Sequence, residues 1–160
     1  MAWSRSFLIG RNQQVLIENV KFSPQPVLSG VPQGTVLGPL YFLIYINDIS
    51  HGLSPGTKIR LFADDSLLYR EIKSDHDTST LQKDLDHLQK WETTWKMEFH
   101  PQKCQILRIT NKRKVTEGNY FIHNIPLQQT NTAKYLGIII DGKLKWKDQY
   151  NTIIKKPTMC

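Results

Sequence analysis

The sequence predicts an α+β domain built around an antiparallel sheet, and two observations carry this prediction. Short alternating apolar segments, which are typical of strands, occur both before and after one long amphipathic segment that is typical of a helix. The two kinds of segment do not alternate regularly along the chain, as they do in proteins with a parallel sheet. With 160 residues, the chain is long enough for one hydrophobic core.

The first half of the chain predicts two strands, a loop and a helix. Residues 15–23, VLIENVKFS, indicate two short strands that turn at Glu18 and Asn19. Residues 27–39 are rich in Gly and Pro and indicate a loop. A helix is expected from Leu40 to Ile49, with Pro39 in its first turn, where the missing N–H costs no hydrogen bond. Since this helix is apolar on nearly every side, we expect it to be buried.

The second half predicts a hairpin, a long helix and further strands. Residues 58–72 indicate a β-hairpin whose tip is Asp64 and Asp65. Apolar residues at helical spacing then predict an amphipathic helix from Asp75 to Met97, with Trp91 and Trp95 as core residues rather than base-stacking platforms. The remaining strands are expected at residues 105–110, 120–123 and 135–140, and the basic residues 143–156 are expected to begin another helix.

Composition and charge narrow the classes of partner. Twenty-one Lys and Arg residues against fourteen Asp and Glu give a net charge of +7, which suits a polyanionic partner without establishing one. No segment has the length and apolar character of a membrane span, so no membrane partner is expected. The two cysteines form no disulfide framework, which favours an intracellular compartment, either nucleus or cytoplasm. The residues indicate no particular oligomeric state.

The adjacent Asp64 and Asp65 are the most unusual feature. Two carboxylates about 4 Å apart repel by about 1 kcal/mol in water and about 4 kcal/mol near a protein surface, so local stability does not explain the pair. A divalent cation would turn this repulsion into shared coordination, and hard oxygen ligands favour Mg²⁺ or Mn²⁺. The alternative is a solvated turn. Because apolar residues 61–63 and 67–69 flank the pair, we expect the turn to be embedded in a core.

Four segments in this order resemble the reverse transcriptases of non-LTR retrotransposons of the jockey and LINE type. They read SGVPQGTVLGPLYFLIYINDI (29–49), LFADDSLLY (61–69), FHPQKCQILRIT (99–110) and YLGIIID (135–141). FADD alone would be a weak signal, but the combination is specific and the resemblance runs from Trp3 to Trp146. It implies a polymerase palm, an antiparallel sheet with packed helices. Residues 1–141 would be a partial reverse transcriptase domain, and residues 142–160 a basic tail at the start of the thumb.

The resemblance implies RNA-directed DNA polymerisation, with an RNA template, a DNA primer and deoxynucleoside triphosphates as partners. Asp64 would be the principal metal ligand and Asp65 its neighbour, holding Mg²⁺ or Mn²⁺ for two-metal nucleotidyl transfer. Lys103 matches a basic residue near the triphosphate that acts as a general acid, although by itself it reads as a surface lysine. Tyr135, Leu136 and Gly137 match the motif that supports the primer.

The SGVPQG motif matches the family segment that lies along the template and the incoming nucleotide. Its glycines let the backbone approach a ligand, and its glutamine offers both a donor and an acceptor. The helix that follows directs its positive end at this loop, which favours phosphate. The alternative is a loop that merely enters a buried helix. The residues implied in binding nucleotide or template are Ser29, Gly30, Pro32, Gln33 and Gly34.

The family's first catalytic motif, an aspartate on a strand, precedes a region that is matched here by WxxSFLxxR at residues 3–11. We expect this motif, the fingers and most of the thumb to be missing from the chain. We therefore expect this polypeptide to be inactive alone. The alternative is a non-catalytic, basic nucleic-acid-binding remnant. Its late lysines would contact phosphate or form a solvated basic face; they are Lys143, Lys145, Lys147, Lys155 and Lys156.

Overall fold

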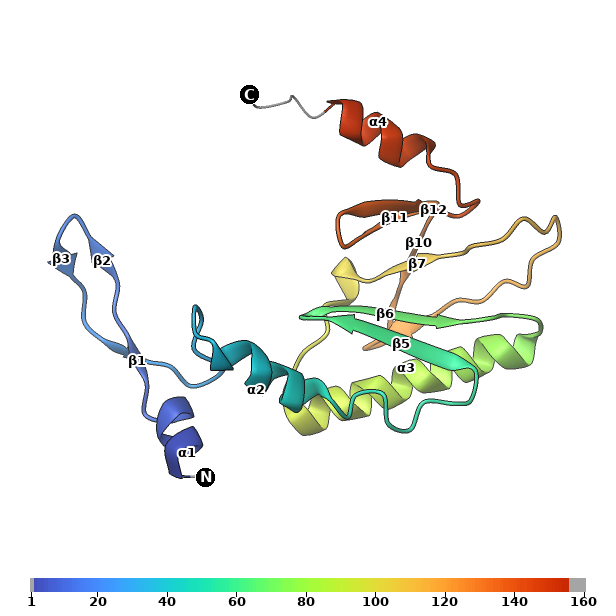
Figure 1. Cartoon of the computed structure of the whole chain (residues 1–160). Helices are drawn as coiled ribbons and strands as arrows, with labels where there is room; N and C mark the ends of the chain where they lie inside the picture. Colours follow the sequence, from blue (N-terminus) through green and yellow to red (C-terminus); the bar gives the residue numbers. More distant parts are fainter. Residues whose placement is uncertain (1, 156–160) are drawn as a thin grey trace. The chain divides into compact units, whose positions relative to one another are not determined.

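The computed structural model describes residues 2–155, which fall into two compact units, residues 2–48 and residues 49–155 (Figure 1). Each unit is described by itself. The observed mixture of helices and small, mostly antiparallel sheets agrees with the predicted α+β class. Within residues 2–155, none of the helices combines the length and the apolar character that a membrane crossing requires.

The first unit begins with a short helix and two small strand pairs. Helix α1 (Ala2–Leu8), which the sequence did not predict, stacks the rings of Trp3 and Phe7 at a centroid distance of 5.3 Å. Strands β2 (Leu16–Ile17) and β3 (Val20–Lys21) form the predicted hairpin, and β1 (Asn12–Gln13) pairs with β4 (Gln25–Pro26). Glu18 and Asn19 form the turn with φ angles of 47° and 65°, so this prediction is confirmed.

Helix α2 (Leu37–Ile46) starts three residues before the predicted position and is not the buried helix that its composition predicts. Ile46 is buried, but Ile44 is 71% exposed, and Leu40 and Leu43 are about half exposed. Besides α2, the described residues of the first unit form strands of two residues each and one seven-residue helix. Elements this short supply too little surface to cover an apolar helix on every side.

The second unit opens with a hairpin and the longest helix of the structure. Strands β5 (Thr57–Phe62) and β6 (Asp65–Arg70) pair over their whole length, and helix α3 (Asp75–Trp95) follows closely the predicted range. A capping box begins α3: the Asp77 carboxylate accepts a hydrogen bond from the backbone N–H of Ser74 at 3.1 Å. The predicted strands after α3 appear in shorter and partly different form.

In the described part of the second unit, up to residue 155, three further strand pairs and one helix follow α3. A 3₁₀ turn (Pro101–Lys103) leads into β7 (Gln105–Leu107), which pairs in parallel with β10 (Gln128–Thr130), a departure from the antiparallel prediction. The predicted strand at residues 135–140 is instead a hairpin, because Leu136 and Gly137 take φ angles of 48° and 83° and reverse the chain. The elements are β7 (Gln105–Leu107), β8 (Phe121–Ile122), β9 (Ile125–Pro126), β10 (Gln128–Thr130), β11 (Thr132–Tyr135), β12 (Ile138–Asp141) and the predicted C-terminal helix α4 (Lys147–Lys155).

The core of the second unit lies between α3, the β5–β6 hairpin and the strands that follow. Its buried centre consists of Leu85, Tyr120 and Ile122, and partly buried residues pack around it: Leu68, Leu81, Phe99, Cys104, Ile106 and Leu127. Burial raises the pKa of the Cys104 thiol and also that of the Tyr120 hydroxyl. Trp91 is buried as predicted, whereas Trp95 is 39% exposed.

Polar side chains on α3 hold the β8–β9 hairpin. The amide of Gln82 makes two hydrogen bonds with the backbone of Phe121, at 2.9 Å and 3.1 Å. Gln89 accepts the backbone N–H of His123 at 2.7 Å, and the buried Glu92 lies 2.8 Å from the ring Nε2 of the same histidine. Side-chain amides thus replace strand neighbours as partners for this two-stranded hairpin.

Candidate active site

The acidic pair lies at the end of the β5–β6 hairpin, but the turn is shifted by one residue from its predicted position. Phe62 pairs with Asp65, so the two residues of the turn are Ala63 and Asp64, and Asp65 already belongs to β6. Ala63 has a φ angle of 50°, a left-handed conformation that is uncommon for a residue with a Cβ. The predicted tip of Asp64 and Asp65 is therefore corrected to Ala63 and Asp64, because Ala63 takes the strained position.

The side of the hairpin that carries Asp65 faces away from the core. Side chains alternate along a strand, so the register puts Asp65 on one face with Arg60 and Phe62. Thr57 and Leu68 belong to the opposite face; Thr57 is buried and Leu68 packs against the core. Phe62 is 62% exposed and both aspartates are exposed. The expectation of a turn embedded in a core is therefore wrong, because only one face of this two-stranded hairpin is covered.

The two carboxylates are available to a ligand. Neither Asp64 nor Asp65 uses its carboxylate in a hydrogen bond or ion pair within residues 2–155. Two adjacent carboxylates supply the hard oxygen donors that Mg²⁺ and Mn²⁺ prefer. In the described part of the chain, no group of three or more His, Cys, Asp or Glu side chains is arranged to hold a metal ion.

The base of the hairpin is fixed to α3 through Asp84, a residue that the sequence analysis did not single out. Its Oδ1 accepts the backbone N–H and the hydroxyl of Ser54, both at 2.8 Å, and its Oδ2 accepts the hydroxyl of Thr57. Arg70 donates to Thr57 Oγ1 at 3.1 Å and to Asp77 Oδ1 at 3.1 Å. The sequence does contain a signal for this role, because Asp84 lies on the otherwise apolar face of the amphipathic helix.

Asp77 links the end of β6 to the start of α3. Its carboxylate accepts the backbone N–H of Lys73 and the hydroxyl of Ser74, and it also pairs with Arg70. These hydrogen bonds, the one from Lys73 first, lower the pKa of Asp77 from its ordinary value of 3.8 to about 2. The hairpin that carries the acidic pair is thus connected to α3 at both strands.

The SGVPQG loop lies in the first unit and is held by two residues that the sequence analysis did not name. Arg11 donates to the backbone carbonyl of Gly30, and from its Nε to the carbonyl of Leu8 at 2.9 Å. Thr35 donates to the carbonyl of Pro32 at 2.8 Å and accepts the N–H of Gly38, near the start of α2, at 3.1 Å. These contacts give the loop a defined backbone conformation, in which Ser29, Gln33 and Gly34 are exposed.

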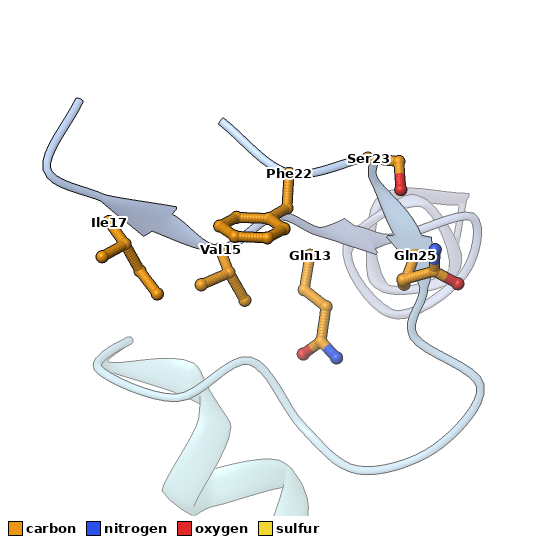
Figure 2. Close-up of a pocket in the computed structure, with 6 residues that line it drawn as sticks. All are labelled: Gln13, Val15, Ile17, Phe22, Ser23 and Gln25. Atoms are coloured by element: carbon orange, nitrogen blue, oxygen red, sulfur yellow. The ribbon is translucent and has the colours of Figure 1, made fainter. Parts of the chain in front are cut away.

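A hollow of the first unit lies beside the β2–β3 hairpin and does not include this loop. Figure 2 shows Phe22, Val15 and Ile17 gathered on one side of the β2–β3 hairpin, with Gln13 and Gln25 nearby. The residues that line it are Gln13, Val15, Ile17, Phe22, Ser23 and Gln25. It is apolar and shallow, and none of the predicted site residues contributes to it.

The remaining predicted site residues lie at turns of the second unit. Lys103 ends the 3₁₀ turn and is exposed. Tyr135 is the last residue of β11, and Leu136 and Gly137 form the turn to β12, so the motif YLG is a hairpin end. Within the described part of the chain, no hydrogen bond or ion pair connects these side chains to Asp64 or Asp65.

Comparison with known proteins identifies relatives over nearly the whole chain. Residues 1–140 match the family described as "Reverse transcriptase (RNA-dependent DNA polymerase)". The probable RNA-directed DNA polymerase from transposon X-element of Drosophila melanogaster is 29% identical over 153 residues, which cover 93% of this chain and 17% of that protein. No solved structure matches the chain.

Polymerases of the mobile element jockey are similar to the same degree. The one from Drosophila melanogaster is 31% identical over 158 residues, covering 93% of this chain and 17% of that protein. The one from Drosophila funebris is 32% identical over 150 residues, covering 89% of this chain and 16% of that protein. The chain therefore spans about one-sixth of the length of these curated relatives.

The matched range contains all four motifs that suggested the resemblance, from SGVPQG to YLG, except for the final aspartate of the last one. The relatives are polymerases of mobile elements, as the motifs predicted. The chain belongs to the reverse transcriptase family, as a relative of the RNA-directed DNA polymerases of non-LTR retrotransposons.

Proposed function

We propose that this chain carries part of the active site of an RNA-directed DNA polymerase, with Asp64 and Asp65 as its metal ligands. The single observation that carries the proposal is the exposed end of the β5–β6 hairpin. There, inside the range that matches the family, two adjacent carboxylates lie without a partner among residues 2–155. In this proposal the small antiparallel pairs belong to a palm-type sheet.

The hairpin holds the carboxylates where substrate has access to them. Asp65 lies on the outward face, and Asp64 lies in the turn beside it. Mg²⁺ or Mn²⁺ bound there would lower the pKa of a primer 3′-hydroxyl and neutralise the charge of the triphosphate and the leaving pyrophosphate. Mg²⁺ bound through one or two carboxylates depends on substrate phosphates to complete its coordination. We therefore propose that the pair holds metal weakly alone and more tightly with a nucleotide.

The other matched motifs would position the substrates. The SGVPQG loop, held by Arg11 and Thr35, offers an exposed backbone to the template and the incoming nucleotide. Lys103, exposed at the end of the 3₁₀ turn, would act near the triphosphate as a general acid. The β11–β12 turn at Leu136 and Gly137 would support the primer. An RNA template, a DNA primer and deoxynucleoside triphosphates are the proposed partners.

A first experiment measures metal binding by the purified chain. Equilibrium dialysis with Mn²⁺ is run with and without dTTP on the wild type and on the double variant Asp64→Asn, Asp65→Asn. We expect bound Mn²⁺ to rise with dTTP in the wild type and not in the double variant. Asp86→Asn, an exposed change on α3, is the matched control and should bind like the wild type. Equal binding by the wild type and the double variant would contradict the proposed metal site.

A second experiment measures activity. Residues 1–140 replace the matching segment of the Drosophila melanogaster jockey polymerase, and the chimera is assayed for primer extension on poly(rA) with an oligo(dT) primer. We expect extension that Asp64→Asn abolishes. Extension that survives in Asp64→Asn would overturn the assignment of the hairpin. The second candidate is a non-catalytic basic module, which the net charge of +7 supports. Binding of nucleic acid by the 160-residue chain, together with no extension by the chimera, would favour this second candidate.

A further inference from the structure

Two basic segments that are about thirty residues apart in sequence lie side by side in the second unit. The backbone N–H of Thr110 donates to the carbonyl of Gly142 at 3.0 Å. The ammonium group of Lys143 donates to the carbonyl of Thr110 at 2.9 Å. A Cβ on Gly142 would lie 2.7 Å from the carbonyl oxygen of Arg108, so the two backbones are in close contact. The loop after β7 and the turn after β12 are therefore in direct contact at Thr110 and Gly142; Figure 1 shows the course of these two segments in the second unit.

The surface of these two segments concentrates positive charge, and within residues 2–155 no acidic side chain forms an ion pair with it. Lys112, Arg113 and Lys114 lie in the loop, Lys145 lies in the turn, and Lys147 is the first residue of α4; all five are exposed. Within residues 2–155, none of these five side chains forms a hydrogen bond or an ion pair. The nearby carboxylate of Asp141 is already engaged, because its Oδ1 accepts the backbone N–H groups of Lys143 and Lys145.

An aromatic side chain stands among these cations. Trp146 lies between Lys145 and Lys147 in sequence and is 68% exposed. Proteins bind single-stranded nucleic acid through clustered cations, which contact the phosphate backbone, and through exposed aromatic rings, on which bases stack. A duplex would keep its bases stacked inside and leave the indole ring without a partner.

We propose that this basic surface, formed by Lys112, Arg113, Lys114, Lys145, Trp146 and Lys147, binds single-stranded nucleic acid. The lysines and the arginine bind phosphates, and Trp146 stacks on a base. The surface shares no residue with the β5–β6 hairpin, so binding there does not depend on nucleotidyl transfer. RNA and DNA offer the same phosphate and base chemistry to it.

The test is fluorescence anisotropy of the 160-residue chain with labelled U20 RNA and dT20 DNA over a range of salt concentrations. The loop variant replaces Lys112, Arg113 and Lys114 with Gln. Each phosphate contact with a single strand contributes about 0.7 to the slope of log affinity against log salt, so we expect this slope to fall by about 2. At about 0.1 M salt the affinity should fall by roughly tenfold or more.

A matched control distinguishes the effect of this surface on affinity from the effect of the net charge of the chain. Lys83, Lys90 and Lys96 are exposed on or just after α3, and replacing them with Gln removes the same total charge. We expect this control to keep the wild-type slope. Equal losses in the two triple variants would mean that only net charge matters and would overturn the proposal. Circular dichroism and urea unfolding confirm that each variant is folded.

The stacking contact has its own variant. Trp146→Leu should weaken binding about fivefold or more without changing the salt slope, because stacking on a base involves no phosphate contact. Trp3→Leu, at a tryptophan that is 59% exposed in the first unit, is the control and should bind like the wild type. Wild-type affinity in Trp146→Leu, or tighter binding of duplex DNA than of dT20, would contradict the single-strand assignment. If the surface variants lose more affinity for one of the two oligonucleotides, U20 RNA or dT20 DNA, that oligonucleotide is the preferred ligand of the surface.

The outcome is independent of the proposed polymerase function. Asp64→Asn should leave the anisotropy titrations unchanged while abolishing extension by the chimera. Failure of extension with intact, surface-dependent binding would therefore reject only the catalytic proposal. An active chimera, together with a single-strand affinity of the 160-residue chain that is unaffected by the surface variants, would reject only the binding proposal.

Discussion

The hydroxyl of Thr57 on β5 donates a hydrogen bond to the carboxylate of Asp84 on α3, and both residues are buried. The same carboxylate accepts two hydrogen bonds from Ser54, so the turn before β5 and the strand itself are bound to one point of the helix. Because β5 and β6 pair only with each other among the described strands, this contact, together with Arg70, sets the orientation of the hairpin relative to α3. The acidic pair lies at the far end of that hairpin.

Replacing Asp84 with Ala should destabilise the chain by about 3 kcal/mol, because it leaves the buried hydroxyl of Thr57 and the Ser54 donors without their acceptor. Urea unfolding followed by circular dichroism measures the change. Asp86→Ala on the same helix is the control; this exposed side chain accepts hydrogen bonds from Gln82 and Gln89, and its loss should cost at most about 0.5 kcal/mol. Similar values for the two variants would refute the role assigned to Asp84.

Asp77 should make stability depend on pH in the acid range. Its pKa is lowered from 3.8 to about 2 in the folded chain, chiefly by the hydrogen bond from the backbone of Lys73. The unfolded chain therefore binds more protons between these values, so the stability that Asp77 contributes is present above pH 3.8 and is lost as the pH falls through about 2.

Urea unfolding of the wild type and of Asp77→Asn tests this dependence. The wild type should be more stable than the variant at pH 6, and the difference should shrink as the pH approaches 2. Asp75→Asn, in the same first turn of α3, is the control, since no hydrogen bond of its carboxylate is found within residues 2–155. A difference between the wild type and Asp77→Asn that stays constant with pH would contradict the prediction.

Replacing Ala63 with Gly should stabilise the hairpin. Ala63 has a φ angle of 50°, and the left-handed conformation costs an L-residue about 1–2 kcal/mol. Gly removes this cost, but it also lowers the free energy of unfolding by about 0.4–1 kcal/mol, because the unfolded chain has more conformational freedom. We therefore expect the free energy of unfolding to rise by about 0.5 kcal/mol in total. Ala133→Gly within β11 is the control and should destabilise by about 0.5–1 kcal/mol. Destabilisation of equal size in both would show that Ala63 is not strained.

Replacing Gly142 with Ala should separate the two basic segments. The added Cβ would lie 2.7 Å from the carbonyl oxygen of Arg108, a backbone atom that moves only if the chain shifts. We expect a loss of about 1–3 kcal/mol in urea unfolding. Gly137→Asn in the β11–β12 turn is the control, because nothing lies within 4 Å of its added Cβ and Asn tolerates positive φ. If Gly142→Ala unfolds like the wild type, the close contact is not part of the fold.

Short-range spacing was enough to predict the elements that stand nearest to the acidic pair. The paired strands around FADD and the helix after them follow from alternation and from helical periodicity, both of which are local. The strands after α3 were less predictable, because they are two to four residues long and each depends on a partner elsewhere in the chain. Because Ala63 has a left-handed backbone conformation, the turn lies one residue before its predicted position. The methyl side chain of alanine gives no indication of such a conformation.

The order and type of residues alone were sufficient to establish the family, the acidic pair and the amphipathic helix, because each is encoded in consecutive residues. Long-range contacts decided the rest: the burial of Asp84, the exposure of α2 and the union of the loop at Thr110 with the turn at Gly142. Whether a side chain is covered depends on which distant segment packs on it. A pattern of neighbouring residues carries no information about that partner.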